Sequence, residues 1–284
     1  MLRVATPILL VAIGAAITLK AGIFNVATEG LMLVAAFLSV VLSTLTGSLL
    51  TGLLLTIVLT ILLALVYGMV TVTLRADPII AGLGVNMFAA GITSWLLQSV
   101  LNSPGGFSSP ETLILPGLDV AAFSNIPVLA AIFNSQNVIT YSSWILAFLA
   151  YLFVHRSKYG LQLRATGEHP VAATTVGISP VRWQYLSLIL CGFFCALGGM
   201  ALSMGSIHLF TKGMTAGRGF ISFAAASFAV GNIPGTVFIS FLFALFSSLT
   251  IRLVGLGIPT RIVQMIPYLV TLVALIFARR RIRL

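Results

Sequence analysis

Long apolar runs, separated by short polar or glycine- and proline-rich stretches, fill most of this chain. Several runs reach about 18 to 25 residues, the length that a helix needs to cross roughly 30 Å of hydrocarbon. The backbone must satisfy its own hydrogen bonds inside a bilayer, so these runs predict helices. Nine apolar segments can be marked, at residues 4–20, 26–44, 49–73, 79–101, 138–154, 183–204, 218–232, 235–255 and 260–278.

The seventh segment, 218–232, is shorter than a full crossing. Gly213, Gly217 and Gly219 weaken a helix just before it, and Pro234 follows it. A broken or re-entrant helix is therefore expected, and such backbone is tolerated at membrane depth only where it is buried in protein or lines a cavity. The pattern predicts an all-α polytopic membrane helical bundle with about eight to nine hydrophobic segments, in one transmembrane domain over residues 1–284.

Composition supports the membrane class, since 59% of residues are hydrophobic, only 7% are charged and the mean hydropathy is +1.15. The core of a soluble globular protein does not require such a high fraction of apolar residues. The net charge of +10 could suggest nucleic-acid binding. However, the basic residues lie at the ends of apolar segments and not along one face, so they indicate membrane topology and no nucleic-acid partner.

The charge distribution predicts which loops face the cytoplasm. The tail after the last apolar segment carries Arg279, Arg280, Arg281 and Arg283. Positive charge beside a span marks the inner side, so the C-terminus is expected in the cytoplasm. Counting back places the polar segment 155–182 inside and the loop at about 102–137 outside. That outer loop has no Lys or Arg, only Glu111 and Asp119, which agrees with the count.

The inner segment is the one long charged stretch of the chain, and it reads HRSKYGLQLRATGEHPVAATTVGISPVRW. It holds four of the 15 Lys and Arg residues, at Arg156, Lys158, Arg164 and Arg182. Such a concentration suggests a docking surface on the cytoplasmic face.

Polar residues inside apolar segments are expensive in a membrane, so each is a candidate site residue. Asn25 and Glu29 are four positions apart, on one helical face. They either line a substrate path, or clamp helices together, or, for Glu29, cap the start of its own helix. Asn86 and Thr93 lie two turns apart and could line the same path or make interhelical hydrogen bonds.

The glycine-rich stretch before the broken helix supplies three further candidates. Thr215, Arg218 and Phe220 would lie near the path if the broken helix lines it. The alternative for Arg218 is an anchor at the membrane interface.

Catalytic constellations are absent from the sequence, which has five acidic residues and three histidines, widely separated. It contains no HExxH motif, no paired carboxylates and no phosphate-binding glycine loop. Cys191 and Cys195, four apart on one helical face, are interpreted as packing residues. We expect no cofactor, no metal and no enzymatic activity, so any nucleotide hydrolysis that energises transport would belong to another chain.

Three stretches carry a resemblance to a known family. The runs GIFNVATEGLMLVAAF, GLQLRATGEHPVAATTVGIS and GMTAGRGFISFAA resemble the permease subunits of ABC importers of the branched-chain amino acid, ribose and nucleoside group. Among these, the chain is most similar to nucleoside and simple-sugar permeases, from about residue 6 to 278. The resemblance implies a multi-pass protein of the bacterial cytoplasmic membrane. It also implies three kinds of partner: ABC ATPase subunits, a second homologous permease in a probable heterodimer, and an external binding protein.

In this family a cytoplasmic helix of the permease seats in a groove of the ATPase, and residues 168–179 match that coupling helix by position. An ordinary solvated loop is the alternative. The helix would begin at Glu168, His169 and Pro170 and end at Gly177. Ala172 and Ala173 would allow close approach. Arg164 and Arg182 would add flanking charge contacts.

The resemblance predicts import of a nucleoside or a related small polar solute. A simple-sugar permease of the ribose or galactose type is the alternative within the family. A secondary transporter driven by an ion gradient is the alternative outside it, but only Glu29 and Asp77 could relay protons within the apolar segments.

Overall fold

The structure is a computed structural model that describes residues 2–103, 105–108, 117–118, 136–207 and 209–255. The ninth predicted segment, the arginine tail and most of the predicted outer loop lie outside these residues.

Helices dominate the described residues, and six of them are long and apolar enough to cross a membrane. These are α1 (Leu2–Lys20), α2 (Thr28–Thr46), α3 (Leu49–Gly68) with its π-helical extension η1 (Met69–Thr73), α4 (Pro78–Ser99), α6 (Val138–Arg156) and α9 (Pro180–Leu202) with the π-helical η3 (Ser203–Ile207). The shorter or later helices are α7 (Lys158–Glu168), α8 (Pro170–Thr175), α10 (Arg218–Phe228) and α11 (Ile233–Gly255). Two antiparallel strand pairs complete them: β1 (Gly106–Phe107) with β4 (Phe210–Thr211), and β2 (Gly117–Leu118) with β3 (Gln136–Asn137).

The predicted all-α polytopic bundle is confirmed. The first six apolar segments correspond to the six long helices, and the eighth corresponds to α11. The seventh is the 11-residue helix α10, about half the length of its neighbours, as expected for a broken helix. Asp77 caps the start of α4: its carboxylate accepts hydrogen bonds from the N–H groups of Ile79 and Ile80, at 2.8 and 3.0 Å, with Pro78 in the first turn.

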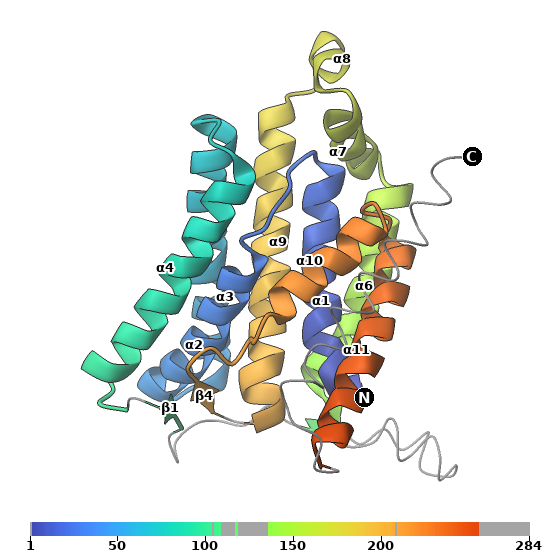
Figure 1. Cartoon of the computed structure of the whole chain (residues 1–284). Coiled ribbons are helices and arrows are strands. Elements are labelled where there is room, and N and C mark those ends of the chain that lie inside the picture. The colour runs from blue at the N-terminus through green and yellow to red at the C-terminus, as the bar shows by residue number, and fades with distance from the viewer. Residues whose placement is uncertain (1, 104, 109–116, 119–135, 208, 256–284) are drawn as a thin grey trace, which may run out of the picture.

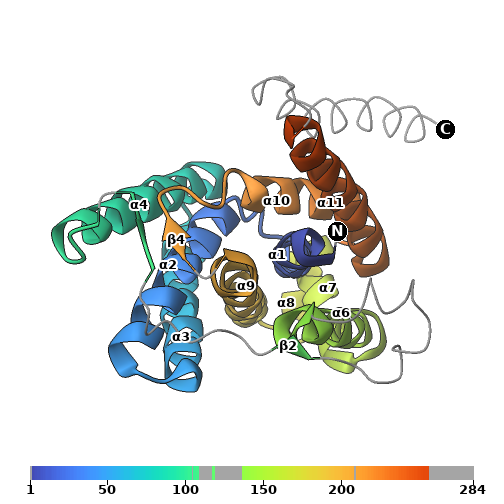
Figure 2. The same cartoon turned by 90° about the horizontal axis from the view of Figure 1, so that it is seen from below.

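Two antiparallel helices, α1 and α9, form the centre of the bundle. Figure 2 shows both inside a ring made by the other long helices. Glycines let them approach closely, since a Cβ on Gly14 would lie 3.1 Å from Cα of Cys191. In contrast, most residues of α3, α4 and α6 are not buried, and the residues that these helices expose are largely apolar. Such faces suit lipid or another apolar protein surface.

Each central helix packs against the two helices that follow the other one. Helix α1 contacts α10 and α11, and α9 contacts α2 and α3. Each is also followed by an irregular stretch that leads into a helix beginning inside the bundle, α2 in one case and α10 in the other (Figure 1). Because α1 and α9 run in opposite directions, this is the arrangement that an inverted repeat produces.

Close packing around the central helices predicts a strong effect of added volume. A Cβ on Gly199 of α9 would lie 2.6 Å from Cβ of Ala35 and from the carbonyl oxygen of Met32. We expect Gly199→Ala to lower the free energy of unfolding by about 1–3 kcal/mol. Gly84 of α4 has no atom within 4 Å of the corresponding position. Gly84→Ala should therefore keep or raise the melting temperature of the detergent-purified protein, and equal losses in both variants would contradict the packing.

Candidate functional site where two broken helices meet

Helices α2 and α10 both begin inside the bundle and not at one of its ends (Figure 1). Neither has a side-chain cap from its own N-cap residue, which is Ala27 for α2 and Gly217 for α10. The first N–H groups of a helix have no partner within the helix. At membrane depth water does not satisfy them, so other parts of the protein must.

Glu29, in the first turn of α2, satisfies the N-terminus of α10. Its Oε1 accepts from the N–H of Gly217 at 3.0 Å, and its Oε2 accepts from the N–H of Gly219 at 2.6 Å. Thr28 adds a bond from its hydroxyl to the carbonyl oxygen of Gly219, at 3.2 Å. A carboxylate is well suited to this position, because the partial positive charge of a helix lies at its N-terminus. Glu29 is thus a cap, but for a helix about 190 residues away in the chain.

Asn86 of α4 does the same for α2. Its Oδ1 accepts from the N–H of Gly30 at 2.7 Å, and its Nδ2 donates to the carbonyl oxygen of Val26 at 3.0 Å. Of the two alternatives for Asn86, the structure shows the interhelical hydrogen bond. Helices α4, α2 and α10 are therefore linked in series, each holding the N-terminus of the next.

Glycines make these capping contacts sterically possible. A Cβ on Gly219 would lie 2.6 Å from the backbone nitrogen of Glu29, and one on Gly30 would lie 2.9 Å from Oδ1 of Asn86. Gly82 lets α4 approach the residues before α2 in the same way, since a Cβ on Gly82 would lie 3.0 Å from the backbone nitrogen of Ala27. From the sequence, Gly219 was expected only to weaken a helix, and no role was predicted for Gly30 or Gly82. Nothing in one sequence distinguishes a glycine at a helix contact from one that faces lipid.

Three of the expected pathway residues face protein. Asn25 is fully buried, and its Oδ1 accepts from the N–H of Ala27 while its Nδ2 donates to Sγ of Cys191, at 3.0 and 3.4 Å. Thr93 is buried and donates to the carbonyl oxygen of Ala89 in its own helix. Thr215 is buried as well. In this conformation none of the three presents a surface to a passing solute, because neighbouring helices cover them.

The surface near the Glu29 cap is instead formed by aromatic and charged groups. Phe24 is 43% exposed and Phe220 38% exposed, and Phe24 packs edge-to-face on Phe223 with ring centroids 4.5 Å apart. Arg218, partly exposed, donates to the carbonyl oxygen of Met214 at 3.0 Å. Phe24 and Phe223 were not among the expected residues. Exposed aromatic faces beside a carboxylate and a guanidinium can contact a solute that has both a ring and hydroxyl groups.

The inner polar segment folds into two helices that project from one end of the bundle (Figure 1). The predicted short helix is present as α8, beginning at Pro170, but it ends at Thr175. Gly177 closes it with φ of 80°: its N–H donates to the carbonyl oxygen of Thr174, and that of Ile178 donates to Ala173. The preceding helix α7 was not predicted, and Glu168 is its last residue and not the start of the short helix α8.

Side chains of this elbow, residues 157–179, differ in their orientation. Val171 and Val176 are 77% and 72% exposed, and Glu168, His169, Pro170 and Ala172 are exposed beside them. Ala173 is only 3% exposed, so it supports α8 from inside and is not available for direct contact with a partner. Arg164 is partly buried. Arg182 is exposed and lines a cavity of about 450 Å³ together with Gln162 and Trp183.

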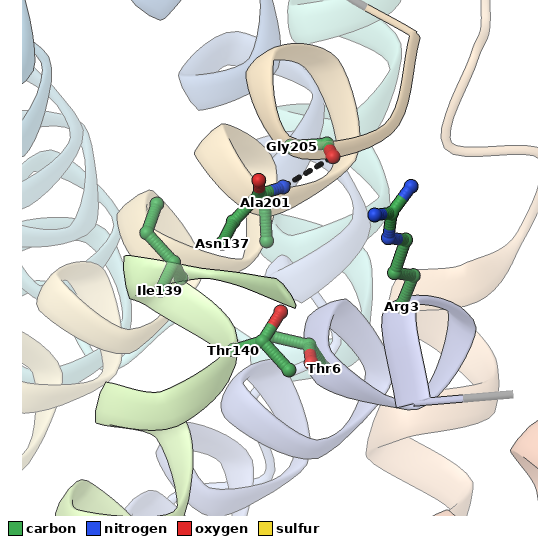
Figure 3. Close-up of a pocket in the computed structure, with 7 residues that line it drawn as sticks. All are labelled: Arg3, Thr6, Asn137, Ile139, Thr140, Ala201 and Gly205. Atoms are coloured by element: carbon green, nitrogen blue, oxygen red, sulfur yellow. Dashed lines mark hydrogen bonds between the residues drawn. The ribbon is translucent and has the colours of Figure 1, made fainter. Parts of the chain in front are cut away.

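A second polar cluster lies at the opposite end of the bundle, where α1, α6 and η3 meet. Figure 3 shows Asn137 donating from its Nδ2 to the carbonyl oxygen of Gly205, with Thr6, Thr140 and Arg3 around it. Arg3 donates from Nε to Oε1 of Gln136 at 3.4 Å. The space that these residues enclose is too small for a solute, so the cluster is a clamp between elements.

Comparison with known proteins gives the family. The family model described as "Branched-chain amino acid transport system / permease component" matches residues 1–275. This chain belongs to that permease family. The permease is accordingly a multi-pass membrane protein, consistent with its six long apolar helices.

Characterised relatives of the permease are subunits of ABC transporters. The nucleoside ABC transporter permease protein NupC of Lactococcus lactis is 32% identical over 97% of this chain and 89% of its own length. The guanosine ABC transporter permease protein NupQ of Bacillus subtilis is 31% identical over 95% of this chain and 88% of its own length. The putative glucose ABC transporter permease protein TsgC13 of Haloferax volcanii is 27% identical over 88% of this chain and 75% of its own length. No solved structure matches the chain.

The capping role of Glu29 predicts how its substitution acts. Glu29→Gln removes the charge and places an amide donor against one of two N–H groups, so we expect the free energy of unfolding to fall by about 1–3 kcal/mol. Glu168→Gln makes the same chemical change at an exposed position. Thermal unfolding of both purified variants is the measurement, and a melting temperature for Glu29→Gln equal to that of Glu168→Gln would contradict the cap.

Proposed function

We propose that this chain is the transmembrane permease subunit of an ATP-driven importer in the bacterial cytoplasmic membrane. With a second permease subunit it forms the pathway for a nucleoside or a related small polar solute, which an external binding protein delivers. The observation that carries the proposal is the capping bond between α2 and the half-length helix α10, in a chain of the permease family whose elbow exposes apolar side chains.

The exposed elbow is the expected seat of the ATPase subunit. Val171 in α8 and Val176 directly after it offer apolar contact area, and Glu168, His169 and Ala172 surround them. Two exposed valines so close together favour contact with another apolar surface. ATP hydrolysis is assigned to that other subunit, so this chain acts by movement and not by catalysis. With the elbow inside, we also expect a cytoplasmic C-terminus, because the last predicted apolar segment is followed by Arg279, Arg280, Arg281 and Arg283.

The aromatic surface beside Glu29 favours a nucleoside as the solute. The exposed faces of Phe24 and Phe220 can stack on a base, while Glu29 and Arg218 can bond hydroxyl or ring polar groups. Two of the relatives are named as nucleoside or guanosine ABC transporter permeases. A sugar is the second candidate, favoured by the glucose and galactose permeases among the relatives.

Reconstituted transport tests the function. The chain would be co-expressed with its permease and ATPase partners, placed in liposomes with the loaded binding protein, and supplied with labelled guanosine, ribose or galactose. We expect ATP-dependent uptake, with guanosine preferred to either sugar. Uptake that requires a proton gradient and persists without ATP would overturn the importer, and preference for a sugar would select the second candidate.

Substitution of the exposed valine Val176 tests whether the elbow binds the ATPase. Val176→Asp should reduce co-purification of the ATPase at least about tenfold, because an apolar groove would have to desolvate the new carboxylate. The amount of protein inserted in the membrane should stay unchanged, since Val176 is exposed.

Val230→Asp is the matched control. Val230 is a 75% exposed valine with φ of 53° in the turn after α10, outside the elbow, and aspartate tolerates that backbone conformation. Equal co-purification of the ATPase with both variants would remove the assignment of α8.

A further inference from the structure

The end of α1 is a tight turn that sends the chain back into the bundle. The N–H of Ile23 donates to the carbonyl oxygen of Thr18 at 2.9 Å, and the N–H of Gly22 donates to Leu19 at 3.1 Å. Gly22 has φ of 82°, as a glycine at such a helix end requires. The linker that follows, residues 21–27, then descends to the start of α2 inside the bundle (Figure 1).

The elbow rests directly on this turn through backbone atoms. A Cβ on Gly167 of α7 would lie 2.9 Å from the nitrogen of Gly22 and still closer to the carbonyl oxygen of Lys20. In the other direction, a Cβ on Gly22 would lie 3.2 Å from Cα of Gly167. No side chain separates the two segments. A contact of this kind cannot absorb a displacement by a change of rotamer, so movement of one segment must move the other.

The linker is anchored along its whole length. Ile23 and Ala27 are buried in one apolar cluster with Tyr67 and Leu188. The hydroxyl of Tyr67 lies 3.4 Å from the carbonyl oxygen of Phe24. The linker is therefore packed against α3 and α9, and it does not move independently of the helices that it contacts.

The half-helix α10 is attached to both ends of this linker. At its start, Glu29 and Thr28, directly after the linker, bond the first turn of α10. At its end, a Cβ on Gly231 would lie 3.1 Å from the carbonyl oxygen of Ala16 and from Cγ of Lys20, in the last turns of α1. A displacement of the end of α1 consequently acts on α10 at two points.

We propose that the Gly167–Gly22 contact is the mechanical joint of this transporter, through which displacement of the elbow moves the 21–27 linker and the half-helix α10. The proposal rests on the proposed function, since the ATPase supplies the displacement. Gly22 and Gly167 are positioning residues, because they act on the path through Glu29 and α10 and touch no solute. The joint converts a movement at the cytoplasmic end into a shift of the broken helix beside the path.

Gly167→Ala tests the joint in the assembled, reconstituted complex. The methyl group forces α7 away from the turn, while the exposed face of α8 keeps its contact with the ATPase. We expect the ATPase to co-purify as with the unmodified chain, ATP hydrolysis to remain within about twofold, and solute imported per ATP to fall by about 2- to 30-fold. Gly105→Ala adds the same methyl group where no atom lies within 4 Å, and it should leave this ratio unchanged.

Gly22→Ala is the second variant, and it decides the matter if Gly167→Ala does not insert. Its Cβ would meet Gly167 at 3.2 Å, and the φ of 82° adds backbone strain at the same contact, so we expect a loss in the same ratio. An unchanged ratio in the variants that insert would overturn the joint. So would a loss of uptake that only parallels a loss of assembled complex, because that is the effect of a merely structural contact. If the unmodified chain binds no ATPase, the proposed function itself fails, which is a separate result.

Discussion

The bond between the Glu29 carboxylate and the start of α10 is the interaction on which the rest of this structure depends. A helix that begins inside a membrane protein leaves N–H groups where water cannot reach them, and each unsatisfied group is costly. Glu29 satisfies two of them with one ionised side chain, and Gly219 leaves the room that this approach needs. Without that bond, the first N–H groups of the half-length helix α10 would have no hydrogen-bond partner inside the bundle.

Capping of a helix start by a side chain of another helix occurs twice in the bundle, and the two caps connect three helices in series. Asn86 of α4 holds the start of α2, and α2 in turn holds the start of α10. The central pair, α1 and α9, is closely packed, and the capped helices lie around it. A closely packed centre with one capped half-length helix suits a permease, since α10 can move as a unit while its polar end stays satisfied.

In the proposed function, the ATPase acts on one part of the molecule and the solute passes another part. The elbow presents Val171 and Val176 at one end of the bundle, whereas Phe24, Glu29 and Phe220 lie within the helical region. The distance between them is bridged by backbone contacts at glycines and by the packed linker 21–27. This division explains how a chain of the permease family can operate with few polar groups of its own: it needs a surface for a partner, a stiff connection and a movable helix.

Local sequence determined the membrane class, the positions of the first six spans and the short seventh helix, because hydropathy and helix-breaking residues act over a few positions. The short helix after His169 was expected from the family resemblance. Only the tertiary structure decided that Glu29 caps α10, that Asn25 is buried against Cys191 and that Ala173 faces inward. Helix α7 was missed as well, since its mixed polar composition has no apolar periodicity to mark it. These outcomes depend on which helices become neighbours, and groups nearly two hundred residues apart, as Glu29 and Gly219 are, share no local pattern that one sequence can reveal.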